Sequence, residues 1–265
     1  MSDALESLKT LSQLDVELNE GIAVLKMNFP PVNALSRTLI DELTRSLDVI
    51  DECHDVRVVV LTGGGRHFCA GADLKGRKDV IQGPGDLSAH SRRNRECYHR
   101  VRECSKPVIA AVNGSALGAG LALVASCDIL VAADTARLGL PEIDVGLMGG
   151  ARHAQRLFPH SLLRRMVLTG HRVSGEELYR LGIVEACVPV EGLLPAALEI
   201  ADDISRKSPL AVRWSKQTLN AIEDMTLRDG YRYEQDMTAA ISETEDAKEA
   251  QRAFLEKRAP RFVGR

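Results

Sequence analysis

The chain has few aromatic residues and no excess of positive charge. Aromatic side chains make up 4% of its 265 residues, so a surface that stacks nucleic-acid bases would have little to draw on. Lysine and arginine together number 34 against 37 aspartate and glutamate residues, which gives a formal net charge of -3. Such a balance does not attract the chain as a whole to polyanions. We therefore expect no nucleic-acid partner.

Metal-binding cysteine patterns and long apolar runs are also missing. The six cysteines form neither a CxxC pair nor a Cys/His cluster at zinc spacing, so they indicate reduced thiols and no metal site. No apolar run approaches the roughly 20 residues that cross a bilayer. The acidic start, MSDALESLKTLSQ, lacks the continuous apolar segment of a secretory signal. These features predict a cytoplasmic protein that does not contact membranes.

Strand and helix patterns alternate through the first half of the chain. The stretch LDVELNEGIAVLKMN predicts two strands around a turn at residues 19–21, and apolar residues recur at helical spacing from Ser36 to about Cys53. The β-branched run VRVVVLTG at 56–63 is typical of a strand buried on both faces. The same order recurs in PVIAAVNG, GAGLALVASC and DILVAA. We therefore predict an α/β core with parallel strands and right-handed crossovers.

The second half is mostly helical in pattern. Residues 76–90, with glycine, proline and mixed charge, predict a mobile loop that leads into a helix. Helical patterns dominate beyond Arg152, Ser174 and Glu177 match a capping box, and VEACVPV is one last short strand. We place a boundary near Glu191, between an α/β core of residues 1–190 and a helical C-terminal region of residues 191–265.

Three glycine-bearing segments follow predicted strands: His67–Lys75, Gly114–Gly120 and Leu140–Gly146. In open α/β sheets, ligands bind at the edge formed by the carboxyl ends of the strands. Taken singly, each segment has a purely structural interpretation: a tight turn, a glycine pair that lets a helix pack on a strand, and a loop acid, Glu142, that faces solvent. A GxGxxG dinucleotide loop does not occur.

Together with other short motifs, these segments point to a known family. The motifs are PVNAL at 31–35, AGADLK at 70–75, KPVIAAVNG at 106–114, GAG at 118–120, CDI at 127–129, PEI at 141–143, QRL at 155–157, LTG at 168–170, LGIV at 181–184, and FLEKR with the P, F and G that follow it at 254–264. In order and spacing they resemble the enoyl-CoA hydratase/isomerase (crotonase) family over nearly the whole chain. The resemblance implies a crotonase-like spiral of ββα units with a helical C-terminal region.

The resemblance also implies a site. A CoA thioester would place its carbonyl oxygen at the backbone N–H groups of Ala72 and Ala119, with Glu142 as the catalytic acid and base. Ala119 replaces a glycine, which is tolerable only if its φ stays negative. Lys75 either lies near CoA or is a solvated lysine. The substrate-binding residues implied are Ala34, Ala70, Gly71, Asp73, Leu74, Lys75, Gly118 and Pro141. Coenzyme A belongs to the substrate, so no separate cofactor is expected.

The resemblance also has implications for the oligomeric state and for the residues near the entrance of the CoA site. The resemblance implies a homotrimer or a dimer of trimers, with the C-terminal region from Glu191 at the interface or over a neighbouring site. The arginine-rich stretch Ser91–Arg95 indicates a solvated helix face, and in the family this region neighbours the adenosine end of CoA.

One departure from the family's hydratase pattern concerns the second acid. Hydratases of the family carry two glutamates, and the first of these positions is Ala122 in this chain. A single carboxylate can still move an α- or γ-proton, which is double-bond isomerisation, although single-acid hydratase-lyases also exist in the family. The apolar neighbours of Glu142 should raise its pKa.

A second departure lies at Arg152 and His153, which replace two glycines near a helix N-terminus. They could meet a substrate carboxylate or phenolate, His153 could shuttle a proton, or both could lie at a subunit contact away from the pocket. The sequence leaves open a decarboxylase or hydrolase on the same scaffold, and a non-catalytic relative that binds acyl-CoA or RNA.

Overall fold

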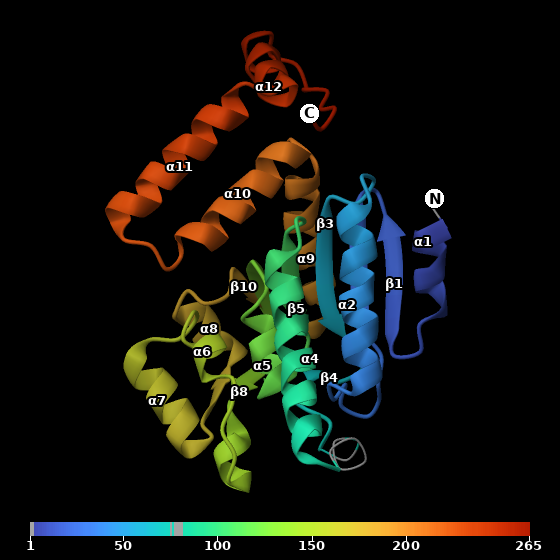
Figure 1. Ribbon diagram of the computed structural model, residues 1–265, viewed down its shortest axis with the longest axis vertical. Helices are drawn as coiled ribbons and strands as arrows, with labels where there is room; N and C mark the ends of the chain where they lie inside the picture. Colours follow the sequence, from blue (N-terminus) through green and yellow to red (C-terminus); the bar gives the residue numbers. More distant parts are fainter. Residues whose placement is uncertain (1–2, 75, 77–81) are drawn as a thin grey trace.

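The computed structural model describes residues 3–74, 76 and 82–265, and its core is built on two sheets (Figure 1). The larger sheet has the strand order β1-β2-β3-β5-β7-β10 and the smaller sheet has the order β4-β6-β8-β9. In the larger sheet the strands are β1 Leu14–Asn19, β2 Ile22–Met27, β3 Val58–Gly63, β5 Val108–Val112, β7 Ile129–Ala133 and β10 Ala186–Val188. In the smaller sheet they are β4 His67–Cys69, β6 Ser115–Leu117, β8 Arg137–Gly139 and β9 Arg172–Ser174.

The chain winds between the two sheets. The strands β3, β5 and β7 lie parallel in the larger sheet, and each is followed by a short strand of the smaller sheet, β4, β6 or β8, before the chain continues into helices. The antiparallel hairpin β1–β2 extends the larger sheet at one edge. This winding confirms the predicted α/β spiral of ββα units, and it brings the ends of β4, β6 and β8 to one side of the molecule.

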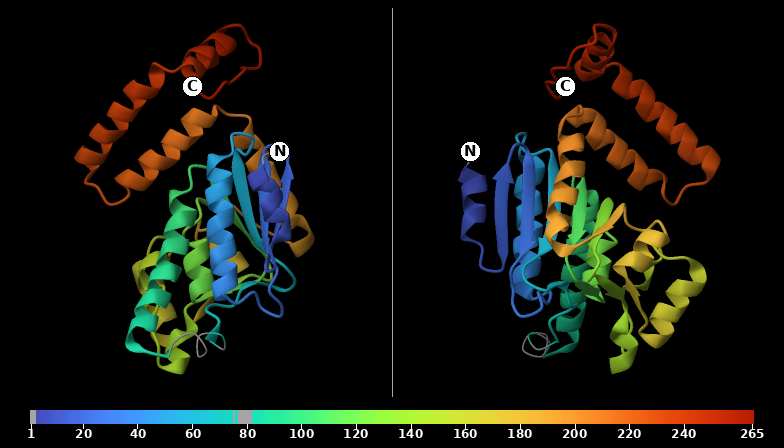
Figure 2. Two further views of the ribbon diagram at one scale, coloured as in Figure 1. Left: turned by 45° about the vertical axis from the view of Figure 1, so that its right-hand side comes forward. Right: turned by 180° about the vertical axis from the view of Figure 1, so that it is seen from behind.

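Helices cover both faces of the larger sheet. Because side chains alternate along a strand, Val58 and Val60 of β3 pack with Leu193 and Ala197 of α9, whereas Val59 belongs to the main core on the other face. The helices α2 and α4 lie over that other face (Figure 2). The helical elements are α1 Asp3–Glu6, η1 Ser7–Thr10, α2 Arg37–Glu52, α4 Pro84–Glu103, α5 Ala119–Val124, η2 Pro141–Val145, α6 Ala151–Ala154, α7 His160–Thr169, α8 Gly175–Arg180, α9 Val190–Ser205, α10 Pro209–Ile222, α11 Leu227–Ser242 and α12 Glu245–Leu255.

Most predicted elements are confirmed, and one is wrong over part of its length. The loop predicted for 76–90 ends early, because α4 begins at Pro84 and residues 84–90 are helical. Proline is favoured at the first helical position, and the Asp86 carboxylate accepts the N–H of Gly83 at 2.8 Å. Ser174 accepts the N–H of Glu177 as predicted, but the Glu177 carboxylate pairs with Arg180 at 2.6 Å instead of completing the box. The short strand β9 was not predicted.

The helices after α9 extend away from the sheets (Figure 2). A buried lysine ties the first of them to the core: Lys216 of α10 is 5% exposed, and its Nζ lies 2.7 Å from Asp128 Oδ2. The same ammonium donates to the carbonyl oxygen of Lys106 at 3.0 Å, and Asp128 Oδ2 also accepts the N–H of Val108 at 2.7 Å. Among the described helices, none is long and apolar enough to cross a lipid bilayer.

Candidate active site

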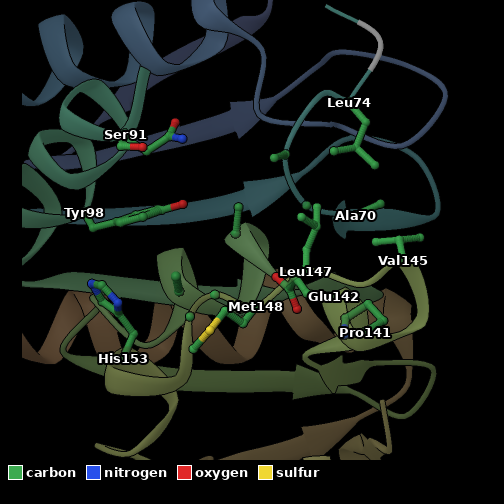
Figure 3. A pocket seen from close by; sticks show the side chains of 18 of the residues that line it. Ala70, Leu74, Ser91, Tyr98, Pro141, Glu142, Val145, Leu147, Met148 and His153 are labelled. Carbon is green, nitrogen blue, oxygen red and sulfur yellow. The ribbon is translucent and has the colours of Figure 1, made fainter. Parts of the chain in front are cut away.

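A cavity of 730 Å³ opens where the three predicted segments meet (Figure 3). Its walls come from the loop after β4, the start of α5, the η2 turn, the loop before α6 and one face of α4. The predicted site residues in its lining are Ala70, Gly71, Ala72, Leu74, Gly118, Ala119, Pro141 and Glu142. Ala34 and Asp73 lie outside that lining, and Lys75 lies outside the described residues.

The backbone N–H of Ala72 has no hydrogen-bond partner among the described residues because of how its loop pairs with Leu35. Leu35 forms a parallel bridge with Ala72, in which the N–H of Leu35 donates to Gly71 O at 2.8 Å and the N–H of Asp73 donates to Leu35 O at 3.3 Å. In a parallel bridge of this kind, the residue opposite, here Ala72, turns its own N–H away from the partner. Over the described part of the chain, this N–H has no hydrogen-bond acceptor.

The amide of Ala119 is left open by a helix start. Ala119 is the first residue of α5, where no preceding turn offers an acceptor for its N–H. Gly118 precedes it with φ +54°, a conformation that side chains rarely adopt. A Cβ added to Gly71 would lie 3.1 Å from Leu117 O and 4.0 Å from Ala119 N, so the two loops lie against each other. Ala119 itself is helical, which confirms that its φ stays negative.

Glu142, in the η2 turn, lies in the same cavity beside Gly118. A Cβ added to Gly118 would collide with Glu142 Oε1, and one added to Gly149 would lie 3.8 Å from the same oxygen. The carboxylate therefore occupies space that two glycines leave free. Its Oε2 is buried and has no hydrogen-bond partner among the described residues. Burial raises the pKa of Glu142 above that of a free glutamate, as the sequence predicted.

Ala122 and Asp144 complete this part of the lining. Ala122, the position at which the resemblance to the family's hydratases implies a second acid, is 1% exposed and contributes only a methyl group to the lining. Asp144 also lines the cavity, but its carboxylate lies against Gly170 at the end of α7, where an added Cβ would be 3.1 Å from Oδ2. Glu142 is therefore the carboxylate of the described lining that lies beside Gly118, at the start of α5.

The face of α4 toward the cavity is polar. The resemblance implied that Ser91–Arg95 neighbours CoA, whereas Tyr98 was not among the predicted residues. Ser91, Asn94, Arg95 and Tyr98 recur at helical spacing and line the cavity, although the stretch has the composition of a solvated face. His153 lines the cavity too, and its ring meets that of Tyr98 edge to face with centroids 5.0 Å apart.

Arg152 and His153, which replace two glycines of the family pattern, lie in different environments in the structure. His153 faces the cavity, so a position away from the pocket is wrong for this residue. Burial, followed by the nearby arginines Arg156 and Arg152 among other groups, lowers the pKa of His153 and favours its neutral form. Arg152 is exposed and pairs with Asp224 at 3.0 Å. Within 3–74, 76 and 82–265, no cluster of histidine, cysteine or carboxylate side chains is arranged to hold a metal ion.

Sequence and structure comparisons find similar proteins over nearly the whole chain. The sequence model of a family described as enoyl-CoA hydratase/isomerase matches residues 17–265. The 2,3-dehydroadipyl-CoA hydratase of Escherichia coli K12 is 37% identical over 260 residues, which cover 96% of this chain and 100% of that protein. The mitochondrial enoyl-CoA hydratase of Pongo abelii is 37% identical over 92% of this chain and 84% of that protein. A solved enoyl-CoA hydratase from Bacillus anthracis matches with a TM-score of 0.91 at 34% identity, over 96% of this chain and 100% of that chain.

Proposed function

We propose that this chain, which belongs to the enoyl-CoA hydratase/isomerase (crotonase) family, acts on acyl-CoA thioesters through the amides of Ala72 and Ala119 and the carboxylate of Glu142. Its two-sheet α/β fold with C-terminal helices is the fold of that family. One juxtaposition carries the proposal. Two N–H groups and a buried carboxylate oxygen, all without partners among the described residues, share one cavity.

The chemistry follows from what each group offers. A thioester carbonyl oxygen placed at the two N–H groups accepts both hydrogen bonds, and each donor stabilises the negative charge of the enolate by about 3–4 kcal/mol. Glu142 removes a proton from the α-carbon, and its raised pKa brings its proton affinity closer to that of a base working near neutral pH. Both amides exist before the substrate arrives, so no reorganisation is needed when charge develops.

The reaction that this arrangement supports best is double-bond isomerisation. Removal of the α-proton from a 3-enoyl ester gives a dienolate, and return of the proton at the γ-carbon gives the 2-enoyl ester. One carboxylate suffices for both transfers. Ala122 offers no second acid to hold a water molecule, which supports this assignment. A second candidate, hydration of a 2-enoyl ester with Glu142 alone, is favoured by the names of the relatives.

Matched 2-enoyl- and 3-enoyl-CoA esters distinguish the two reactions. We expect the unaltered chain to interconvert them, which liquid chromatography detects as a product of unchanged mass. Ala122→Glu supplies a second acid from a position that lines the cavity, so its hydration product, heavier by one water, should rise about tenfold relative to isomerisation. Ala122→Gln, of similar size but without the acid, is the control. The proposal would be rejected if none of the esters were converted and calorimetry showed no binding of a saturated acyl-CoA at millimolar concentration.

We propose a homotrimer or a dimer of trimers, assembled through residues 191–265. Large apolar side chains on the C-terminal helices support this, because they are between 59% and 91% exposed in the single chain: Leu219, Leu227, Tyr231, Phe254 and Leu255. An interface that buries them would remove this surface from water. Light scattering at micromolar concentration should give three or six times the mass of one chain, and a monomer would contradict the proposal.

We also propose a cytoplasmic location. All six cysteines are free thiols, and Cys69, Cys97 and Cys127 are buried. Burial raises the pKa of the Cys69 and Cys97 thiols to about 12, so they stay protonated and unreactive at neutral pH. Free thiols of this kind suit a reducing compartment.

A further inference from the structure

Two polar side chains at one side of the cavity take no part in the chemistry assigned to Glu142. Figure 3 shows the hydroxyl end of Tyr98 pointing into the cavity, with His153 beside it and Glu142 across from them. Over the described residues, neither the Tyr98 hydroxyl nor the His153 ring nitrogens form a hydrogen bond within the protein. Both groups are therefore available to a ligand.

Both groups are neutral hydrogen-bond donors. Burial raises the pKa of the Tyr98 hydroxyl, so it keeps its proton. The lowered pKa of His153 leaves a neutral imidazole, which carries one N–H donor. An acyl chain made only of carbon would displace water from these groups and leave each of them without a hydrogen bond, which weakens its binding.

Apolar side chains also line the cavity. Leu74, Val145, Leu147 and Met148 line the cavity and provide apolar contact for the carbon skeleton of an acyl group. The cation in the described lining, Arg95, is exposed and lies 3.4 Å from the Glu96 carboxylate. The polar side of the cavity is thus served by neutral donors, which match a neutral acceptor better than a carboxylate.

We propose that Tyr98 and His153 bind a neutral oxygen, a carbonyl or hydroxyl group, that the acyl part of the substrate carries beyond its reacting carbons. The inference rests on the proposed function, since it assigns a substrate class to the same cavity. The preferred substrates are accordingly oxygen-bearing acyl-CoA esters, and plain hydrocarbon acyl chains are poorer ones.

A pair of matched esters tests this directly. The probes are a 2-enoyl-CoA ester with a ketone near the far end of its chain and the same ester with a methylene group there. The unaltered protein should give a kcat/KM about tenfold or more higher for the keto ester. In Tyr98→Phe, which loses one hydrogen bond, this ratio should fall about tenfold. His153→Leu should also lower the ratio of kcat/KM for the keto ester to that for the plain ester. Tyr179→Phe, at an exposed tyrosine of α8, should leave it unchanged.

Binding of the saturated counterparts separates the inference from the proposed function. Tighter binding of the keto ester than of the plain ester, lost in Tyr98→Phe, supports the inference even if no ester is turned over, and lack of turnover would then count against the proposed function alone. Equal binding and equal kcat/KM for the two esters would overturn the inference while turnover remained. Preference for an ester that ends in a carboxylate would overturn it as well.

Discussion

Replacing Glu142 with glutamine should lower kcat on any active ester by about 10²-fold or more, with little change in the affinity for a saturated acyl-CoA. The side chain keeps its shape between Gly118 and Gly149 but can no longer take up the α-proton. Steady-state kinetics and calorimetry measure the two quantities separately. Glu185→Gln removes an exposed carboxylate and should leave both unchanged. Near-full turnover in Glu142→Gln would move the role of base to Asp144 or His153.

The pKa of Glu142 adds a readout that does not depend on activity. Since the folded pKa lies above the value in the unfolded chain, ionisation of Glu142 costs stability as pH rises from the ordinary glutamate pKa through the folded one. That cost is fully present at neutral pH and disappears in acid. Glu142→Gln should therefore melt at a higher temperature than the unaltered protein at pH 7, and the difference should vanish below the ordinary glutamate pKa. An unchanged difference across that range would mean that Glu142 is not buried as described.

Replacing Lys216 with methionine should lower the free energy of unfolding by about 3–5 kcal/mol. The ammonium is buried with Asp128 at 2.7 Å, and burial already raises the pKa of Asp128 although Lys216 lowers it. Without Lys216, this carboxylate would stay buried and unpaired by charge. Denaturant unfolding at one fixed protein concentration measures the change.

An exposed lysine provides the matched control for this change. Lys248 is exposed and lies 3.7 Å from the Glu243 carboxylate, so Lys248→Met should cost at most about 1 kcal/mol. A loss no larger than that in Lys216→Met would show that the buried pair does not hold α10 to the core.

Sequence patterns predicted the scaffold better than the site. The runs that form β3, β5 and β7 are β-branched and bounded by glycine or polar residues, so their burial could be predicted from composition. The strand β9 spans three residues, too few for a period to appear. The start of α4 was misplaced because glycine and proline at 83–85 are equally common in loops and at helix N-termini.

The site residues differ in how well they can be predicted from the sequence around them. Ala72 and Ala119 are proposed to act through backbone N–H groups, which every residue except proline has, so only the family resemblance pointed to them. Glu142 had a local signal in its apolar neighbours. Tyr98 had none, because it belongs to a helix rich in arginine whose inward face depends on packing that the sequence does not display.

Gly118 joins the two halves of the proposed chemistry at a single backbone position. It sets the turn that opens the Ala119 amide, and its missing side chain is the space in which Glu142 Oε1 lies. A change at Ala122 or on α4 alters one contact at a time, so substrate choice can diverge in small steps among related chains. At Gly118 any side chain would disturb the Ala119 amide and the Glu142 carboxylate together. No substitution at this position can therefore adjust one of the two groups and leave the other in place.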